Sequence, residues 1–129
     1  MKILILDDED VRHREFDKRY LGHHLTHVRT YSEFKQVYGS GSDWDLVHLD
    51  HDLGSFGTGL DAPETYEDGW GCLVPYDGRD VVDFMLACDD LPRKVIVHSV
   101  NTVRAPVMVE MLRTRGADVS WIPFRIYRE

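Results

Sequence analysis

Short apolar runs alternate with amphipathic segments along this chain, and the alternation predicts an α/β fold. The runs have the length and the polar boundaries of strands in a buried parallel sheet. The second run is more polar than the others, which suits a strand at the edge of the sheet. The expected strands are residues 2–6, 25–29, 44–49, 94–97 and 119–122.

The segments between these runs repeat apolar side chains at helical spacing, so they predict surface helices. The sequence Thr30-Tyr31-Ser32-Glu33 has the spacing of a capping box with Thr30 as N-cap, and Gly39 ends the helix that follows. Pro106 is compatible only with the first turn of a helix, and Gly116 suits the end of that helix. The expected helices are residues 9–20, 31–38, 79–87 and 107–115.

This element order implies right-handed crossovers and a single doubly wound, flavodoxin-like α/β domain over residues 1–129. The expected fold is a five-stranded parallel sheet with strand order 2-1-3-4-5. Only residues 124–129 follow the last expected strand, so we expect the closing helix of such folds to be missing. The flank left bare is then expected to be covered by a long loop or by another subunit of a homo-oligomer.

Residues 54–78 form a long insertion after the third expected strand. They contain six of the ten glycines of the chain, together with Phe56, Tyr66, Trp70 and Tyr76. Connections of this length without secondary structure are uncommon in compact domains, and the aromatic content argues against disorder. We therefore expect a packed loop that overhangs the strand ends and closes over the site. The alternative is an insertion that has no part in the site.

The chain is acidic, with 23 Asp and Glu residues against 15 Lys and Arg residues and a formal net charge of -8. Binding to a broad nucleic-acid surface is disfavoured because it relies on many cationic side chains. A small phosphorylated ligand or a single nucleic-acid end stays compatible with this charge. No apolar run approaches the ~20 residues of a membrane span, and the two cysteines form no Cys-x-x-Cys pair. We expect a cytoplasmic protein with reduced thiols.

Three polar clusters follow three of the expected strands. Asp7-Asp8 follows the first strand, Asp50-His51-Asp52 the third and His98-Ser99-Val100-Asn101 the fourth. Ligands of open α/β sheets bind outside the carboxyl ends of the strands. Because these strands would be neighbours, their ends would lie within about 10 Å of one another. The sequence therefore predicts that the three clusters form one site.

The carboxylates of these clusters predict a divalent metal site. Residues 36–78 contain nine carboxylates and neither Lys nor Arg, so Asp7, Asp8, Asp50 and Asp52 would repel one another without a cation. Mg²⁺ or Mn²⁺ would relieve this repulsion, with Asp7, Asp8 and Asp50 as the expected ligands. Nearby imidazoles also suit Mn²⁺ or Zn²⁺. The alternative for Asp7 or Asp8 is that one of them caps the first helix.

Two histidines flank these carboxylates. His51 and His98 are expected to act as general acid and base or as metal ligands, because imidazole titrates near neutral pH. Asp50 is expected to be a metal ligand or a nucleophile, and Asp52 to orient an imidazole. The alternative for each histidine is a hydrogen-bonded structural role. We expect that structural role for His48 and exposed positions for three further histidines, His23, His24 and His27.

Ser99, Asn101 and Arg104 are the candidate phosphate-binding residues. They lie at the expected start of a helix, where backbone N–H groups and the helix dipole attract anions. The alternative is turn chemistry for Ser99 and Asn101, with Asn101 or Thr102 as a helix cap, and a solvated position for Arg104. The same two interpretations apply to Arg12 and His13 near the start of the first helix.

The clusters resemble those of response-regulator receiver domains. In receivers an acidic pair holds Mg²⁺, an aspartate is phosphorylated, and a hydroxyl residue contacts the phosphoryl group; Asp7-Asp8, Asp50 and Ser99 match this arrangement. Receivers carry a Lys before the Pro at the end of their fifth strand, where this chain has Ile122 before Pro123. They also lack an imidazole on each side of the site.

A divergent receiver-like family, the cyclic-phosphate processing receiver domains, gives a closer resemblance. The matching segments are Leu6-Asp7-Asp8, Arg12-His13 with Phe16, Leu49-Asp50-His51-Asp52-Leu53, His98-Ser99-Val100-Asn101 and Trp121-Ile122-Pro123-Phe124. The resemblance implies hydrolysis of cyclic phosphates on nucleotides or RNA ends. We therefore expect a metal-dependent phosphoesterase with a small phosphorylated substrate, a nucleotide or a nucleic-acid end, and no membrane partner. The alternatives are a phospho-accepting signalling receiver and a nucleotide-binding module without catalysis.

Overall fold

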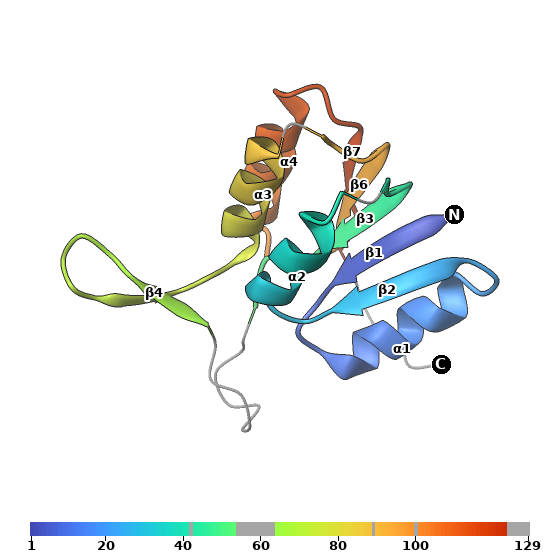
Figure 1. The fold of residues 1–129 in the computed structure, drawn as a ribbon, viewed down its shortest axis with the longest axis horizontal. Helices are drawn as coiled ribbons and strands as arrows, with labels where there is room; N and C mark the ends of the chain where they lie inside the picture. Colours follow the sequence, from blue (N-terminus) through green and yellow to red (C-terminus); the bar gives the residue numbers. More distant parts are fainter. Residues whose placement is uncertain (42, 54–63, 89, 100, 124–129) are drawn as a thin grey trace.

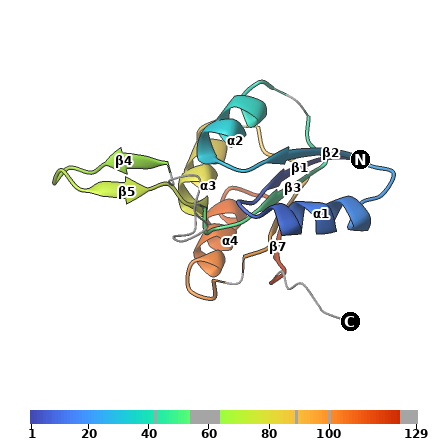
Figure 2. The same ribbon diagram turned by 90° about the horizontal axis from the view of Figure 1, so that it is seen from below.

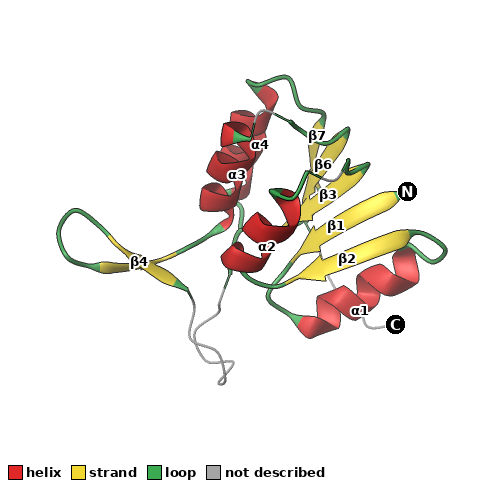
Figure 3. Cartoon of the chain, in the orientation of Figure 1, coloured by secondary structure: helices red, strands yellow, loops and turns green. Residues whose placement is uncertain are grey.

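A parallel sheet with helices on both faces forms the body of the protein (Figures 1 and 3). The computed structural model describes residues 1–41, 43–53, 64–88, 90–99 and 101–123. The strands of the sheet are β1 (Lys2–Leu6), β2 (His24–Val28), β3 (Leu46–Leu49), β6 (Lys94–Val97) and β7 (Val119–Trp121). They are hydrogen bonded in the order β2-β1-β3-β6-β7, and every pair is parallel. The predicted α/β fold with order 2-1-3-4-5 is confirmed.

The helices are α1 (Asp10–Arg19), α2 (Tyr31–Tyr38), α3 (Gly78–Ala87) and α4 (Ala105–Arg113). Thr30 is the N-cap of α2 as predicted, because its hydroxyl oxygen accepts a hydrogen bond from the Glu33 N–H at 3.1 Å. Pro106 lies in the first turn of α4, which begins two residues before its expected start. None of the described helices is both long and apolar enough to cross a membrane.

Side chains alternate across β1 and divide the core into two layers. Leu4 and Leu6 pack with the apolar residues of α2, α3 and α4, whereas Ile3 and Ile5 pack against Phe16 of α1. Figure 1 accordingly shows α1 on the opposite side of the sheet from α2 and α3. Among the described residues, α1 is the only helix on its face; residues 124–129 lie outside them. The expected oligomer through this flank stays a prediction.

The insertion differs from the packed loop that we expected. Strands β4 (Thr65–Glu67) and β5 (Leu73–Pro75) pair antiparallel and form a hairpin that extends away from the sheet (Figures 1 and 2). At its tip, Trp70 is 92% exposed. The prediction of a packed loop is therefore wrong for residues 64–78, because β4 and β5 pair with each other as a ribbon. Closure over the site stays a prediction, and residues 54–63 lie outside the described part of the chain.

Gly78 joins the hairpin to the body of the protein. Its N–H donates a hydrogen bond to the carbonyl of His51 at 2.8 Å. A Cβ atom at this position would lie 2.7 Å from the Asp50 carbonyl oxygen, from the His51 Cα and from the Met108 Cε. Two of these atoms are backbone and cannot move independently, so only glycine lets α3 begin so close to the residues that follow β3.

Gly78→Ala should lower the free energy of unfolding by about 1–3 kcal/mol, the usual cost of overpacking a buried position. Urea unfolding followed by circular dichroism measures this difference. Gly69→Ala is the matched control, because a Cβ at Gly69 meets nothing within 4 Å, and its effect should stay below about 0.5 kcal/mol. Equal losses in the two variants would contradict the close packing at Gly78.

Candidate functional site

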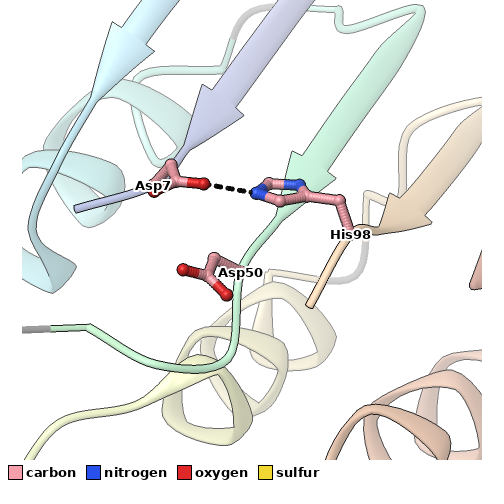
Figure 4. A group of neighbouring side chains, drawn as sticks. All are labelled: Asp7, Asp50 and His98. Atoms are coloured by element: carbon pink, nitrogen blue, oxygen red, sulfur yellow. Dashed lines mark hydrogen bonds and ion pairs between the residues drawn. The ribbon is translucent and has the colours of Figure 1, made fainter. Parts of the chain in front are cut away.

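Asp7, Asp50 and His98 meet at the carboxyl ends of three adjacent strands (Figure 4). Each has a potential ligand atom within 4.8 Å of those of the other two. The register of the sheet explains this convergence: Leu6 pairs with Leu49, and Leu49 pairs with Val97. Each site residue directly follows one of these paired residues, so the ends of β1, β3 and β6 deliver all three to the same place.

Asp7 and His98 form a buried pair. His98 Nε2 lies 2.8 Å from Asp7 Oδ2, and both side chains are at most 1% exposed. Burial lowers the pKa of His98 despite this hydrogen bond, so the imidazole is neutral at neutral pH. Burial opposes ionisation of Asp7, but hydrogen bonds from His98 and the Glu9 N–H, with the charge of Arg12, hold its pKa below the ordinary value.

Arg12 lies across the carboxylates of the site. Its Nε is 2.8 Å from Asp7 Oδ2, and its Nη2 is 3.4 Å from Asp50 Oδ2 and 3.7 Å from Asp8 Oδ1. The side chain comes from the first turn of α1, immediately after the turn that Asp7 and Asp8 begin. Glu9 Oε1 is also 3.7 Å from Nη2. One guanidinium thus faces four carboxylates, and it offers N–H donors in the geometry that binds carboxylate or phosphate oxygens.

Asp50 is the carboxylate with the least favourable surroundings. Burial and the neighbouring charge of Asp7 raise its pKa to about 8, with Arg12 acting in the opposite direction. The site therefore carries a proton on Asp50 at neutral pH unless another positive charge takes its place.

The donor set fits a divalent cation. Two carboxylates and an imidazole, all buried and close together, suit Mn²⁺ or Zn²⁺, and the carboxylates alone with water suit Mg²⁺. Asp8, which we expected to be a third carboxylate ligand, does not belong to this group; His98 completes it. The cluster among the described residues can thus hold a metal, with Asp7 and Asp50 in the predicted positions.

His51 follows Asp50 in the sequence, and its imidazole is held by two carboxylates. Its Nδ1 is 2.9 Å from Asp52 Oδ1, and its Nε2 is 3.3 Å from Asp77 Oδ2. Burial opposes its charged form, but the hydrogen bonds and charges of Asp77 and Asp52 raise its pKa above the ordinary value. Asp52 is thus placed to orient an imidazole, as its sequence position suggested, and Asp77 does so from the other side.

Asp77 was not a candidate from the sequence. It is the N-cap of α3: its carboxylate accepts hydrogen bonds from the Arg79 and Asp80 N–H groups. The Asp80 side chain reaches back to the Asp77 N–H, which completes a capping box. The spacing of Asp77 and Asp80 was the available signal for the cap, but no local pattern indicates that the cap also contacts His51.

The loop after β6 shows the turn chemistry that was the alternative to phosphate binding. The Ser99 hydroxyl oxygen accepts a hydrogen bond from the Asn101 N–H. Asn101 Oδ1 in turn accepts from the N–H groups of Val103 and Arg104. Arg104 is exposed and is the N-cap of α4, without a side-chain cap. The structure thus gives Asn101 a structural partner, and it gives Arg104 no described contact with the carboxylate cluster.

The remaining histidines are mostly structural. His48 is buried and hydrogen bonded to the Tyr20 hydroxyl at 2.6 Å, as expected. His27 was expected to be exposed, and that prediction is wrong: it is half-buried, with Nδ1 2.5 Å from His13 Nδ1 and Nε2 2.7 Å from Asp17 Oδ1. His13 also contacts the Asp7 carbonyl oxygen at 2.8 Å. This chain of contacts fixes α1, and therefore Arg12, against the end of β1.

His23 and His24 are exposed, as expected. His23 Nδ1 lies 2.9 Å from the amino-terminal nitrogen of Met1.

The family model of the cyclic-phosphate processing receiver domain matches residues 2–114, which include every residue of the site described above. The chain belongs to this family. The match confirms the resemblance that the polar clusters indicated. No curated protein matches the chain.

Solved structures of receiver domains share the fold of this cyclic-phosphate processing receiver domain. A signal receiver domain from Vibrio parahaemolyticus is 18% identical, with a TM-score of 0.59 over 98% of this chain and 79% of its own. The N-terminal domain of a response regulator/sensory box/GGDEF protein from Carboxydothermus hydrogenoformans is 22% identical, with a TM-score of 0.55 over 95% and 81%. A response regulator receiver domain from Methylobacillus flagellatus is 13% identical, with a TM-score of 0.54 over 98% and 88%.

The affinity for a divalent cation should rise from about pH 6 to about pH 8 and then level off. Below the raised pKa of Asp50 the cation must displace a proton, so affinity increases by roughly tenfold per pH unit for one proton. Calorimetric titration with Mn²⁺ at several pH values measures this slope. In Asp50→Asn, which has no proton to release, binding should be weaker and its pH dependence flatter. An unchanged slope in that variant would assign the proton to another group.

Proposed function

We propose that this chain is a metal-dependent phosphoesterase that hydrolyses a cyclic phosphate. The observation that supports the proposal is the buried group of Asp7, Asp50 and His98, with the Arg12 guanidinium across its carboxylates. Carboxylates that hold a cation, an arginine for phosphate oxygens and imidazoles for proton transfer are the parts that phosphate ester hydrolysis needs. Membership of the cyclic-phosphate processing family favours a cyclic ester as the substrate.

Hydrolysis joins the oxygen of water to phosphorus, breaks one ring P–O bond and delivers a proton to the departing oxygen. A divalent cation bound by Asp7 and Asp50 would supply positive charge to the phosphate and lower the pKa of a bound water. His98 is neutral because it is buried. With Mg²⁺ held by the two carboxylates alone, its imidazole would stay free to accept the proton of the attacking water. His51 has a raised pKa between two carboxylates, so it can carry a proton to the departing oxygen.

Arg12 takes the phosphate-binding role in this proposal, in preference to the exposed Arg104. When Asp50 binds the cation, the Nη2 group that lies 3.4 Å from its Oδ2 would be free to donate to a phosphate oxygen of the substrate. Asp7 keeps its contact with Arg12 Nε and so holds the guanidinium in place.

A second candidate function is that of a signalling receiver, and the shared fold of the solved receiver domains favours it. Asp50 follows β3 and would be the phosphorylated residue. Against this function, Ile122 stands before Pro123, where receivers carry a lysine. An acid-labile phosphoryl group that stays on Asp50 after treatment with acetyl phosphate, without ester hydrolysis, would support the receiver function over the enzyme.

Wild-type protein with Mg²⁺ or Mn²⁺ should hydrolyse 2′,3′- or 3′,5′-cyclic nucleotides, and chelation with EDTA should abolish turnover. Asp7→Asn and Asp50→Asn should each lower kcat/KM by at least about a hundredfold, because the cation loses a charged ligand. Asp118→Asn is the matched control: this exposed carboxylate lies at the opposite end of the sheet, before β7. Chromatographic detection of the ring-opened nucleoside monophosphate, with each cation, measures the activity. Absence of turnover for every cyclic phosphate would contradict the enzyme, and tight binding of intact nucleotide would then favour a binding module.

Arg12→Ala should raise KM for a cyclic phosphate by roughly 10- to 100-fold, the value of a lost charge-assisted hydrogen bond. Arg12→Lys should recover only part of this loss, because an ammonium cannot span Asp7 and the phosphate as a guanidinium does. Arg14→Ala removes a neighbouring exposed arginine of α1 and serves as the control. A KM for Arg12→Ala equal to that of wild type would remove Arg12 from the phosphate site.

A further inference from the structure

Three tyrosines stack at the base of the hairpin. The Tyr31 and Tyr76 ring centroids are 4.2 Å apart with an interplanar angle of 14°, and the Tyr66 ring lies 4.8 Å from Tyr76 at 45°. Lys35 covers another side of the column, with Nζ 5.2 Å from the Tyr31 ring centroid. Tyr66 is the outer ring of this column, which we call the tyrosine stack.

The tyrosine stack is linked to the candidate site through Asp77 and His51. Tyr76 is followed by Asp77, whose carboxylate lies 3.3 Å from His51 Nε2. The next residue, Gly78, is hydrogen bonded to the His51 carbonyl. One residue spans about 3.8 Å, so the inner rings of the stack lie within a few residues' length of the group that would carry a proton in hydrolysis. Figure 1 shows the hairpin on the side of the sheet to which the strand arrowheads point.

Anchoring of the hairpin accounts for only part of the stack. Tyr31 against Tyr76 joins the hairpin to α2, and the Glu64 carboxylate strengthens this joint by accepting hydrogen bonds from the Ser32 hydroxyl and N–H. Among the described residues, Tyr76 is the one aromatic ring that Tyr66 contacts. The Tyr66 ring packs against Tyr76 across the ribbon, and its half-exposed side also offers a face for a flat ligand.

The charge around the stack selects which part of a ligand can lie there. Residues 64–80 contain Glu64, Glu67, Asp68, Asp77 and Asp80 against one cation, Arg79; Lys35 adds a second cation beside Tyr31, so the surroundings of the stack stay net negative. Desolvation and the charges of Asp80 and Asp77 raise the pKa of the Tyr66 phenol, as expected for a ring among carboxylates. A phosphate or a polyphosphate chain is repelled from such a surface. A neutral aromatic base is not, and its amino groups can donate to the carboxylates.

We infer that the tyrosine stack binds the base of a cyclic mononucleotide whose phosphate occupies the Asp7–Asp50–His98 site. The inference rests on the proposed function, and it extends it from cyclic phosphates in general to those that carry a nucleobase. It also separates a mononucleotide from an RNA end, because the further phosphates of an RNA strand would have to run along the acidic hairpin.

Steady-state kinetics with three substrates test this assignment: adenosine 2′,3′-cyclic phosphate, base-free glycerol 1,2-cyclic phosphate, and an RNA oligonucleotide that ends in a 2′,3′-cyclic phosphate. Wild-type KM should be at least about tenfold lower for the adenosine compound than for the base-free compound, since stacking of one base is worth about that factor. Tyr66→Ala should bring these two KM values together. The RNA oligonucleotide should have a higher KM than the adenosine compound. This difference should shrink as salt is added, because salt screens the repulsion between the RNA phosphates and the acidic hairpin.

Two variants make the test specific. Tyr66→Phe keeps an aromatic face and should recover most of the discrimination that Tyr66→Ala loses. Trp70→Ala removes the exposed aromatic ring at the hairpin tip, outside the stack, and should leave discrimination as in wild type. Equal KM values for base-bearing and base-free substrates in wild type, or equal discrimination in wild type and Tyr66→Ala, would overturn the assignment. A lower KM for the RNA end than for adenosine 2′,3′-cyclic phosphate would overturn the assignment of a mononucleotide as the substrate.

If no substrate is turned over, calorimetric binding of adenosine 2′-monophosphate and of inorganic phosphate, each with Mn²⁺, separates the two proposals. Tighter binding of the nucleotide to wild type than to Tyr66→Ala would support the tyrosine stack as a base site while the phosphoesterase fails. Equal binding by the two proteins would overturn the base site as well.

Discussion

The site depends on one constraint, which is that like charges are buried at the meeting point of three parallel strands. The pairing of Leu6, Leu49 and Val97 brings the next residue of each strand to that point, and two of the three are aspartates. Buried carboxylates repel each other and oppose their own ionisation unless positive charge is near. Arg12 supplies part of that charge from α1, and a proton on Asp50 or a bound cation supplies the rest. The contacts of His13 and His27 keep the helix in place for this purpose.

The sheet and two of the carboxylate positions were predictable because they depend on short-range patterns. Apolar runs that end in polar residues mark parallel strands, and their order places Asp7 and Asp50 together. From the sequence, Arg12 could equally be a phosphate-binding residue or a solvated one, because the direction of its side chain depends on the rotation of α1 against the sheet. Asp77 was missed because it reaches His51 across an insertion whose path no local pattern determines. Asn101 looked equally suited to a phosphate and to a turn; hydrogen bonds to Val103 and Arg104 in the structure favour the turn.

The hairpin shows why a long glycine-rich segment need not be a loop. Thr65–Glu67 and Leu73–Pro75 are three residues each, shorter than a strand pattern needs for recognition. Asp68 closes the turn between them by accepting hydrogen bonds from the Trp70 and Cys72 N–H groups. A two-stranded ribbon of this size is marginally stable alone. Its order comes from the attachment of its base to α2, so local sequence could not have revealed it.

The junction at Gly78 has a mechanical consequence. This residue is hydrogen bonded to the His51 carbonyl, has no room for a Cβ beside the Asp50 backbone, and is also the first residue of α3. The hairpin is therefore coupled, through Gly78, to the backbone that carries Asp50. A displacement of the hairpin would therefore reach first the backbone of Asp50 and His51, and with it the carboxylate that Asp50 contributes to the buried cluster.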